Sequence, residues 1–163
     1  MKAIRLLGPN SLELQEMPIP EIREDEMLIR VRAAAICGSD VRMYKNGYKN
    51  VSKECPLTLG HEFAGDIAKL GAAVNGYSVG QRVSLAPNYG CGTCKHCVSG
   101  NTHLCADYRA FGISVDGGFA EYVRVPREAI LQGNVTPMDQ QISYQQAALV
   151  EPLSCVYNGQ RLI

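Results

Sequence analysis

The sequence predicts a mainly β domain with short helices, folded as a partly open barrel. Most of the 163-residue chain consists of short strand-like runs separated by turns rich in glycine and proline, and helical periodicity appears only after Ser143. Many short strands with little helix favour a barrel-like architecture. One loop, over residues 88–108, contains four of the seven cysteines.

The chain begins with an expected hairpin, because Gly8-Pro9-Asn10-Ser11 separates two strand-like runs and such residues favour tight turns. The clearest strand is 27–35, where Arg30 and Arg32 alternate with apolar residues. Strands are expected over residues 2–7, 12–17, 27–35, 59–70, 82–86, 119–125 and 129–131, and helical segments over 144–150 and after Pro152.

A short helix is expected after the strand 27–35. Ser39 is a natural N-cap residue, the helix would run to about Asn46, and Gly47 would end it. The strand 59–70 is expected to be broken at Gly65.

The composition excludes several classes of function. Sixteen lysines and arginines balance sixteen aspartates and glutamates, so the chain lacks the positive charge that binds nucleic acid or anionic membranes. No apolar stretch approaches the roughly 18 residues of a membrane span, and the charged N-terminus is untypical of a signal peptide. We therefore expect a cytoplasmic protein whose cysteines serve metal binding or catalysis rather than disulfides.

The cysteine-rich loop predicts a structural metal site. Cys91, Cys94 and Cys97 follow a Cys-x-x-Cys-x-x-Cys spacing, and Cys105 comes shortly afterwards. Four thiolates in one short loop can close a tetrahedral zinc site, and such closed sites are structural. An iron–sulfur cluster is the alternative, because its cysteine spacings can be similar.

A second, open metal site is predicted where three stretches meet. Cys37, His61 and a carboxylate would give three protein ligands and leave one position free, as in catalytic zinc sites. An alcohol or carbonyl oxygen could take that position, with zinc as a Lewis acid. The remaining cysteines, Cys55 and Cys155, are expected to be buried small residues. The three stretches are Ile36–Asp40, Thr58–Asp66 and Val150–Cys155.

Five motifs, in order along the chain, give a resemblance to a known family. They are Gly38-Ser39-Asp40, Gly60-His61-Glu62-Phe63-Ala64-Gly65, the four-cysteine loop, Gly117-Gly118-Phe119-Ala120-Glu121-Tyr122 and Glu151-Pro152-Leu153-Ser154. Together they resemble the zinc-dependent medium-chain alcohol dehydrogenases over essentially the whole chain. Glu151 stands where such enzymes carry a second ligand cysteine. This variant is similar to the polyol branch, with sorbitol, threonine and galactitol-phosphate dehydrogenases as neighbours.

The resemblance implies two zinc ions, a structural one in the cysteine loop and a catalytic one. Cys37, His61 and either Glu62 or Glu151 would hold the catalytic zinc, and Cys155, one turn beyond Glu151, is a further candidate ligand. The implied reaction is hydride transfer from an alcohol to NAD or NADP, which gives a ketone.

Three residues beside this site have catalytic roles by resemblance. Ser39 would pass the alcohol proton towards solvent, the alternative being a helix N-cap only. Asp40 would orient His61, the alternative being a solvated turn residue. Glu62 is either a direct ligand or a structural carboxylate near the metal.

The implied architecture is a GroES-like catalytic domain over 1–142, with its zinc lobe at about 88–108, and a helical bridge over 143–163 towards a dinucleotide-binding domain. The 163 residues contain no Gly-x-Gly-x-x-Gly turn, so we expect the Rossmann domain to be absent from this chain. The apolar side of the bridge is then expected to be partly exposed and to favour a homo-oligomer. That side consists of Leu149, Val150, Leu153, Val156 and Leu162.

Two classes of function remain open. The first is the catalytic domain of a dehydrogenase for a polyol or another secondary alcohol, and the second is a zinc-stabilised binding or scaffold module without chemistry. Cys37, His61 and Glu151 discriminate, because a scaffold needs only the cysteine loop. A zinc hydrolase could use Glu62 as its base, but the sequence has no His-Glu-x-x-His run. Neither the alcohol nor the choice between NAD and NADP is readable from these residues.

We predict that the isolated 163-residue chain binds zinc but oxidises no alcohol, because it lacks the motif that would hold the hydride acceptor. The measurement is the alcohol-dependent reduction of NAD or NADP by the purified chain, followed by absorbance. Robust turnover would show that this expectation is wrong.

Overall fold

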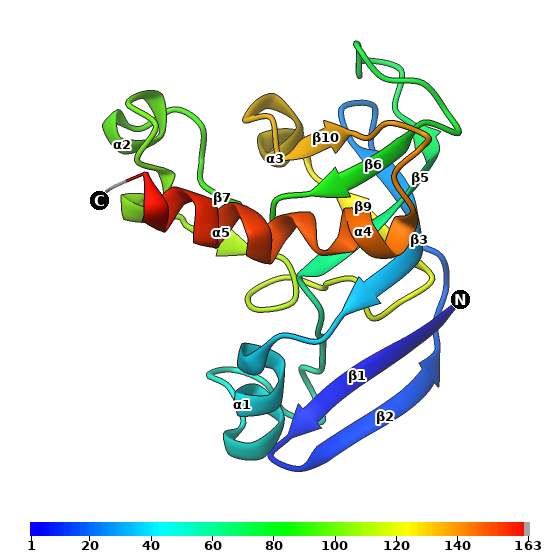
Figure 1. Cartoon of the computed structure of the whole chain (residues 1–163). Helices are drawn as coiled ribbons and strands as arrows, with labels where there is room; N and C mark the ends of the chain where they lie inside the picture. Colours follow the sequence, from blue (N-terminus) through cyan, green and yellow to red (C-terminus); the bar gives the residue numbers. More distant parts are fainter. Residues whose placement is uncertain (162–163) are drawn as a thin grey trace.

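The computed structural model describes residues 1–161 and is mainly β with short helices, as expected (Figure 1). Leu162, expected on the apolar side of the bridge, lies outside the described residues. Within residues 1–161, no helix has the length and apolar character needed to cross a membrane. The strands are β1 (Lys2–Gly8), β2 (Ser11–Glu16), β3 (Met27–Ala35), β4 (Leu57–Thr58), β5 (Glu62–Leu70), β6 (Arg82–Leu85), β7 (Asn88–Tyr89), β8 (Arg109–Ala110), β9 (Tyr122–Val125) and β10 (Val135–Pro137). The helices are α1 (Gly38–Asn46), α2 (Lys95–Val98), the 3-10 turn Thr102–Leu104, α3 (Arg127–Leu131), α4 (Tyr144–Ala148) and α5 (Val150–Gln160).

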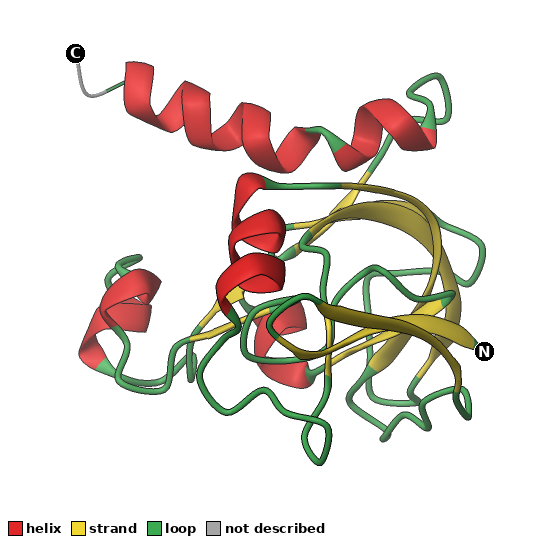
Figure 2. Ribbon diagram, turned by 90° about the horizontal axis from the view of Figure 1, so that it is seen from below, coloured by secondary structure: helices red, strands yellow, loops and turns green. Residues whose placement is uncertain are grey.

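Two curved sheets form a partly open barrel (Figure 2). The larger has the order β10-β6-β5-β3-β9, and the smaller has the order β2-β1-β4. Apolar side chains from the larger sheet, including Phe63, Ile67 and Val83, pack with Tyr89 and Phe111 into the main core. The hairpin and the strand 27–35 agree with the sequence-based prediction, since β1 pairs with β2 antiparallel and β3 has the expected bounds.

The expected strand over 59–70 was wrong at its start, where the chain bends between β4 and β5. Gly60 has φ +89°, a conformation that favours glycine, and the bend leaves His61 between the two strands. Gly65, expected to break the strand, stays within it and pairs with Val31.

Two other local predictions were also wrong. The N-cap of α1 is Cys37, not Ser39, and Gly47 ends the helix as expected. Residues 129–131 belong to helix α3, which begins after Pro126. The strand at this end of the chain is β10 instead, which pairs with the edge of β6.

Helices α4 and α5 are nearly continuous and lie across one side of the sheet (Figures 1 and 2). Leu149, in a helical conformation, ends α4 and precedes α5. Pro152 was expected to mark a new start, but it lies in the first turn of α5, where its missing N–H has no intrahelical partner to lose.

The glycine-rich stretch at 117–119 runs beside residues 58–60 and fixes the bend that carries His61. The N–H of Gly118 donates to the Gly60 carbonyl at 2.7 Å, and the N–H of Phe119 donates to the Leu59 carbonyl at 2.9 Å. A Cβ atom at Gly117 would lie 2.1 Å from the Gly60 oxygen and 2.5 Å from Gly112 Cα. Since both neighbours are backbone atoms, only glycine fits this position.

We predict that Gly117→Ala lowers the free energy of unfolding by about 1–3 kcal/mol, the usual cost of overpacking. Gly159→Ala is the matched control, because nothing lies within 4 Å of a Cβ there and the residue is in a helix. That change should raise stability by about 0.5–1 kcal/mol. Urea denaturation measures both variants, and equal effects would contradict the close packing of the two glycine stretches.

Candidate functional site

The register of β3 and β5 brings the first candidate site together. Ala35, the last residue of β3, pairs with Glu62, the first residue of β5. Cys37 follows two residues after Ala35, and His61 immediately precedes Glu62. The Cys37 sulfur, a ring nitrogen of His61 and a Glu62 oxygen all lie within 4.8 Å of one another. His61 and Glu62 are buried, and Cys37 is half-buried.

Asp40 lies beneath this cluster and is buried, so the alternative of a solvated turn residue is wrong. Its carboxylate accepts the N–H of Cys37 at 2.8 Å and the N–H of Gly60 at 3.2 Å. Asp40 therefore connects the segment that carries Cys37 with the segment that carries His61. Asp40 Oδ1 also lies 3.7 Å from Nδ1 of His61.

The two ring nitrogens of His61 face different neighbours. Nε2 lies 3.4 Å from the Ser39 hydroxyl oxygen, and Nδ1 is turned towards Asp40. Nδ1 is buried and has no hydrogen-bond partner among the described residues. A histidine that binds a metal through one nitrogen usually donates the other N–H to a carboxylate, a backbone carbonyl or a water molecule, and Asp40 is the carboxylate on this side of the ring. Together with a thiol and a second carboxylate, this arrangement fits the ligand chemistry of zinc.

Glu151 approaches the same cluster from α5 but is not part of it. Burial raises the pKa of the Glu151 carboxyl, and the electrostatic interaction with nearby His61 partly offsets this effect. The Cys155 thiol, one turn further on, donates to Glu151 Oε1 at 3.6 Å. Burial and then the Glu151 carboxylate raise the pKa of this thiol. Cys155 and Cys55, expected to be buried, are both exposed.

The four cysteines of the loop form a second cluster. The sulfurs of Cys91, Cys94, Cys97 and Cys105 lie within 4.8 Å of one another. Hydrogen bonds from Thr93, together with the Cys94 N–H, lower the pKa of the Cys91 thiol to about 6, which favours the thiolate that zinc requires. Burial raises the pKa of the Cys97 thiol to about 11.

The cysteine lobe stands apart from the barrel (Figure 1), and side chains that the sequence did not single out hold it. Strands β7 and β8 pair at its base. The Gln132 side chain donates to the Gly90 carbonyl at 2.9 Å, and the Asn134 side chain donates to the Ala86 and Asn88 carbonyls at 2.8 and 2.7 Å. Gln132 and Asn134 follow α3 in a stretch without a recognisable motif, so no sequence signal indicated them.

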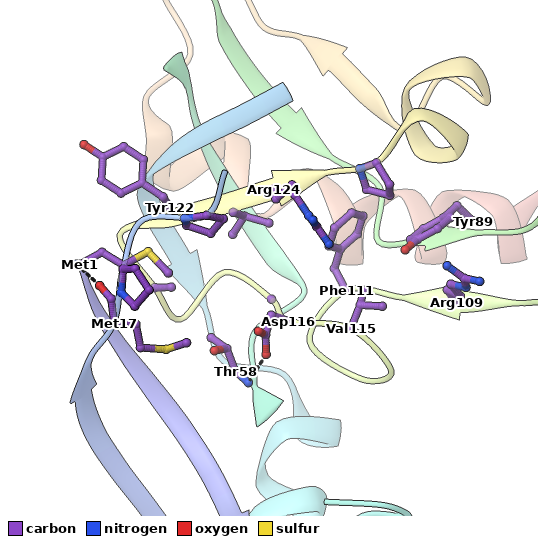
Figure 3. A pocket seen from close by; sticks show the side chains of 16 residues that line it. Met1, Met17, Thr58, Tyr89, Arg109, Phe111, Val115, Asp116, Tyr122 and Arg124 are labelled. Atoms are coloured by element: carbon purple, nitrogen blue, oxygen red, sulfur yellow. Dashed lines mark hydrogen bonds between the residues drawn. The ribbon is translucent and has the colours of Figure 1, made fainter. Parts of the chain in front are cut away.

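A cavity of about 260 Å³ lies elsewhere, between the N-terminal hairpin and β9 (Figure 3). Tyr89, Phe111 and Val115 form one wall, and Arg109 and Arg124 also line it. None of the predicted site residues contributes to this lining. The predicted chemistry therefore gathers at the two clusters and not in this cavity.

Several known proteins are similar to this chain in sequence. The family model of the alcohol dehydrogenase GroES-like domain matches residues 23–135. Sorbitol dehydrogenase of Bacillus subtilis is 38% identical over 94% of this chain and 43% of its own length. L-threonine 3-dehydrogenase of Mesorhizobium japonicum is 39% identical over 94% of this chain and 44% of its own.

The fold is also that of solved dehydrogenases. The crystal structure of galactitol-1-phosphate dehydrogenase from Escherichia coli superposes with a TM-score of 0.84 and 35% identity, over 94% of this chain and 42% of that one. The chain thus spans less than half the length of the relatives it matches. The expected GroES-like fold is confirmed, and the chain belongs to the family of alcohol dehydrogenase GroES-like domains.

Proposed function

We propose that this chain is the zinc-bearing catalytic part of an NAD(P)-dependent dehydrogenase that oxidises a polyol or another secondary alcohol to a ketone. The observation that carries the proposal is the cluster of Cys37, His61 and Glu62, whose ligand atoms lie within 4.8 Å of one another. A scaffold stabilised by one structural metal has no use for this second cluster. The sorbitol and galactitol-phosphate dehydrogenases among the relatives support a polyol as the substrate class.

In this proposal Cys37, His61 and Glu62 hold a catalytic zinc, and Cys91, Cys94, Cys97 and Cys105 hold a structural one. Three protein ligands leave a fourth position open at the first site, whereas four thiolates close the second. Zinc in the open site would supply Lewis-acid activation of an alcohol hydroxyl.

The surrounding residues have separate tasks. Asp40 orients the His61 ring, because its carboxylate lies 3.7 Å from Nδ1 and accepts the N–H of Gly60, the residue before His61. Ser39, half-buried and 3.4 Å from His61 Nε2, receives the proton of the substrate hydroxyl and passes it to solvent. Glu151 lies beyond the ligand cluster, so we assign it to the substrate side of the site and not to the first set of ligands.

We further propose that residues 1–142 form the catalytic domain and that 143–163 form a bridge towards a domain that binds the nicotinamide cofactor. Helix α5 supports this assignment, because Leu149, Leu153, Val156 and Tyr157 are exposed large apolar side chains on or beside it. The same proposal places the protein in the cytoplasm as a homo-oligomer.

Elemental analysis tests the two metal sites. We expect two zinc ions per chain in the wild type, one after His61→Ala and one after Cys94→Ser. Cys55→Ser is the matched control and should keep both, because Cys55 is exposed and outside both clusters. A wild type with one zinc that disappears with Cys94→Ser would favour the scaffold.

Cobalt substitution tests the chemistry at the open site. The chain loaded with Co²⁺ should change its visible spectrum when sorbitol is added, because an alcohol oxygen enters the open coordination position. His61→Ala should abolish the change. L-threonine, a secondary alcohol with charged amino and carboxylate groups, is the alternative ligand to be tested in the same way. A spectrum that responds to neither compound would overturn the proposed dehydrogenase site even if the metal is bound.

A further inference from the structure

Strand β5 carries two functional features on one face. Side chains alternate along a strand, so Glu62, Ala64 and Asp66 share a face, while Phe63 and Ile67 point into the main core. Glu62 belongs to the metal cluster. Ala64 packs against Ala147 and Ala148 of α4. The same face therefore presents a metal ligand at one end and contacts helix α4 further along.

Asp66 is the polar anchor of that contact. Its Oδ1 accepts the hydroxyl of Tyr144, the first residue of α4, at 2.6 Å. Its Oδ2 accepts Nε of Arg32 at 2.7 Å. The β3–β5 register shifts between Val31 and Ala33, so Arg32 has no directly paired residue on β5. Both carboxylate oxygens of this largely buried side chain are thus occupied.

The Tyr144 ring is fixed from a second direction. The Arg82 guanidinium lies 4.1 Å from the ring centroid, and Arg82 also donates to the carbonyls of Gln140 and Ile142 just before α4. The Ser84 hydroxyl donates to the Ala147 carbonyl at 2.9 Å at the other end of the helix. Helix α4 is therefore held to the sheet along its length.

Helix α5 has much weaker attachments of its own. None of its residues is buried. Glu151 lies in its first turn, immediately after the end of α4 at Leu149. Because Leu149 keeps a helical conformation, the direction of α5 is set by α4. The position of Glu151 beside His61 and Glu62 thus depends on the anchors of α4.

We propose that Asp66 is a positioning residue, which acts through the Tyr144 hydroxyl to hold Glu151 at the open side of the Cys37–His61–Glu62 site. This inference rests on the proposed function of that site. The Asp66–Tyr144 bond lies on the far side of Ala64 from the metal cluster, so it has no direct access to the metal or to the substrate. Its effect reaches the site only through the backbone of α4 and α5.

The test is ¹¹³Cd NMR of the full chain loaded with Cd²⁺, which takes the place of zinc. The wild type should show one resonance from the all-thiolate lobe and one from the Cys37–His61–Glu62 site. Tyr144→Phe removes only the hydroxyl and keeps the ring under Arg82. We expect it to shift the second resonance in the same direction as Glu151→Gln, and Asp66→Asn to do likewise. The double variant that combines Tyr144→Phe with Glu151→Gln should move the second resonance no further than Glu151→Gln alone.

Tyr157→Phe is the matched control, because Tyr157 is an exposed tyrosine of α5 and should leave both resonances in place. A cooperative urea unfolding transition reports that each variant is folded. If Tyr144→Phe leaves the second resonance unmoved while Glu151→Gln shifts it, the positioning role of Asp66 is overturned and the metal site stands. If the wild type lacks the second resonance, the proposed metal site fails, and the inference with it.

Discussion

The pairing of β3 with β5 is the constraint on which the rest of the molecule depends. Its register sets Ala35 opposite Glu62, so the turn after β3 delivers Cys37 to the place where the bend before β5 delivers His61. A shift by one residue would turn Glu62 to the other face of the sheet. The same shift would also move Asp66 away from Tyr144 and detach the helical segment. One strand pair thus fixes both the Cys37–His61–Glu62 cluster and the helices beside it.

Local sequence signals predicted the features that are local in the chain. The alternation over 27–35 gave β3 its bounds, and the spacing of the cysteines predicted a cluster whose members are close in sequence. Predictions failed where tertiary packing overrides propensity. Residues 129–131 are apolar enough for a strand, but Pro126 starts a helical turn there, and β10 forms later because β6 offers an edge.

The sequence could not tell which of Glu62 and Glu151 lies beside Cys37 and His61, because this depends on geometry between distant segments. Glu62 enters the cluster through strand register, and Glu151 stays outside through the path of α5. The exposure of Cys155 has the same origin, since α5 packs only one side against the sheet. Gln132 and Asn134 were missed because a side-chain amide that binds backbone carbonyls leaves no pattern in the sequence.

The two clusters differ in how far apart their members lie along the chain. The lobe cysteines span only Cys91 to Cys105, so closing a short loop brings them together. Metal binding can offset the entropy lost in closing this loop before the barrel has folded. The donors Cys37 and His61 meet only after β3 and β5 have paired. The two proposed metals would therefore bind to a newly made chain in a fixed order, lobe first. The second metal would then report the completion of folding.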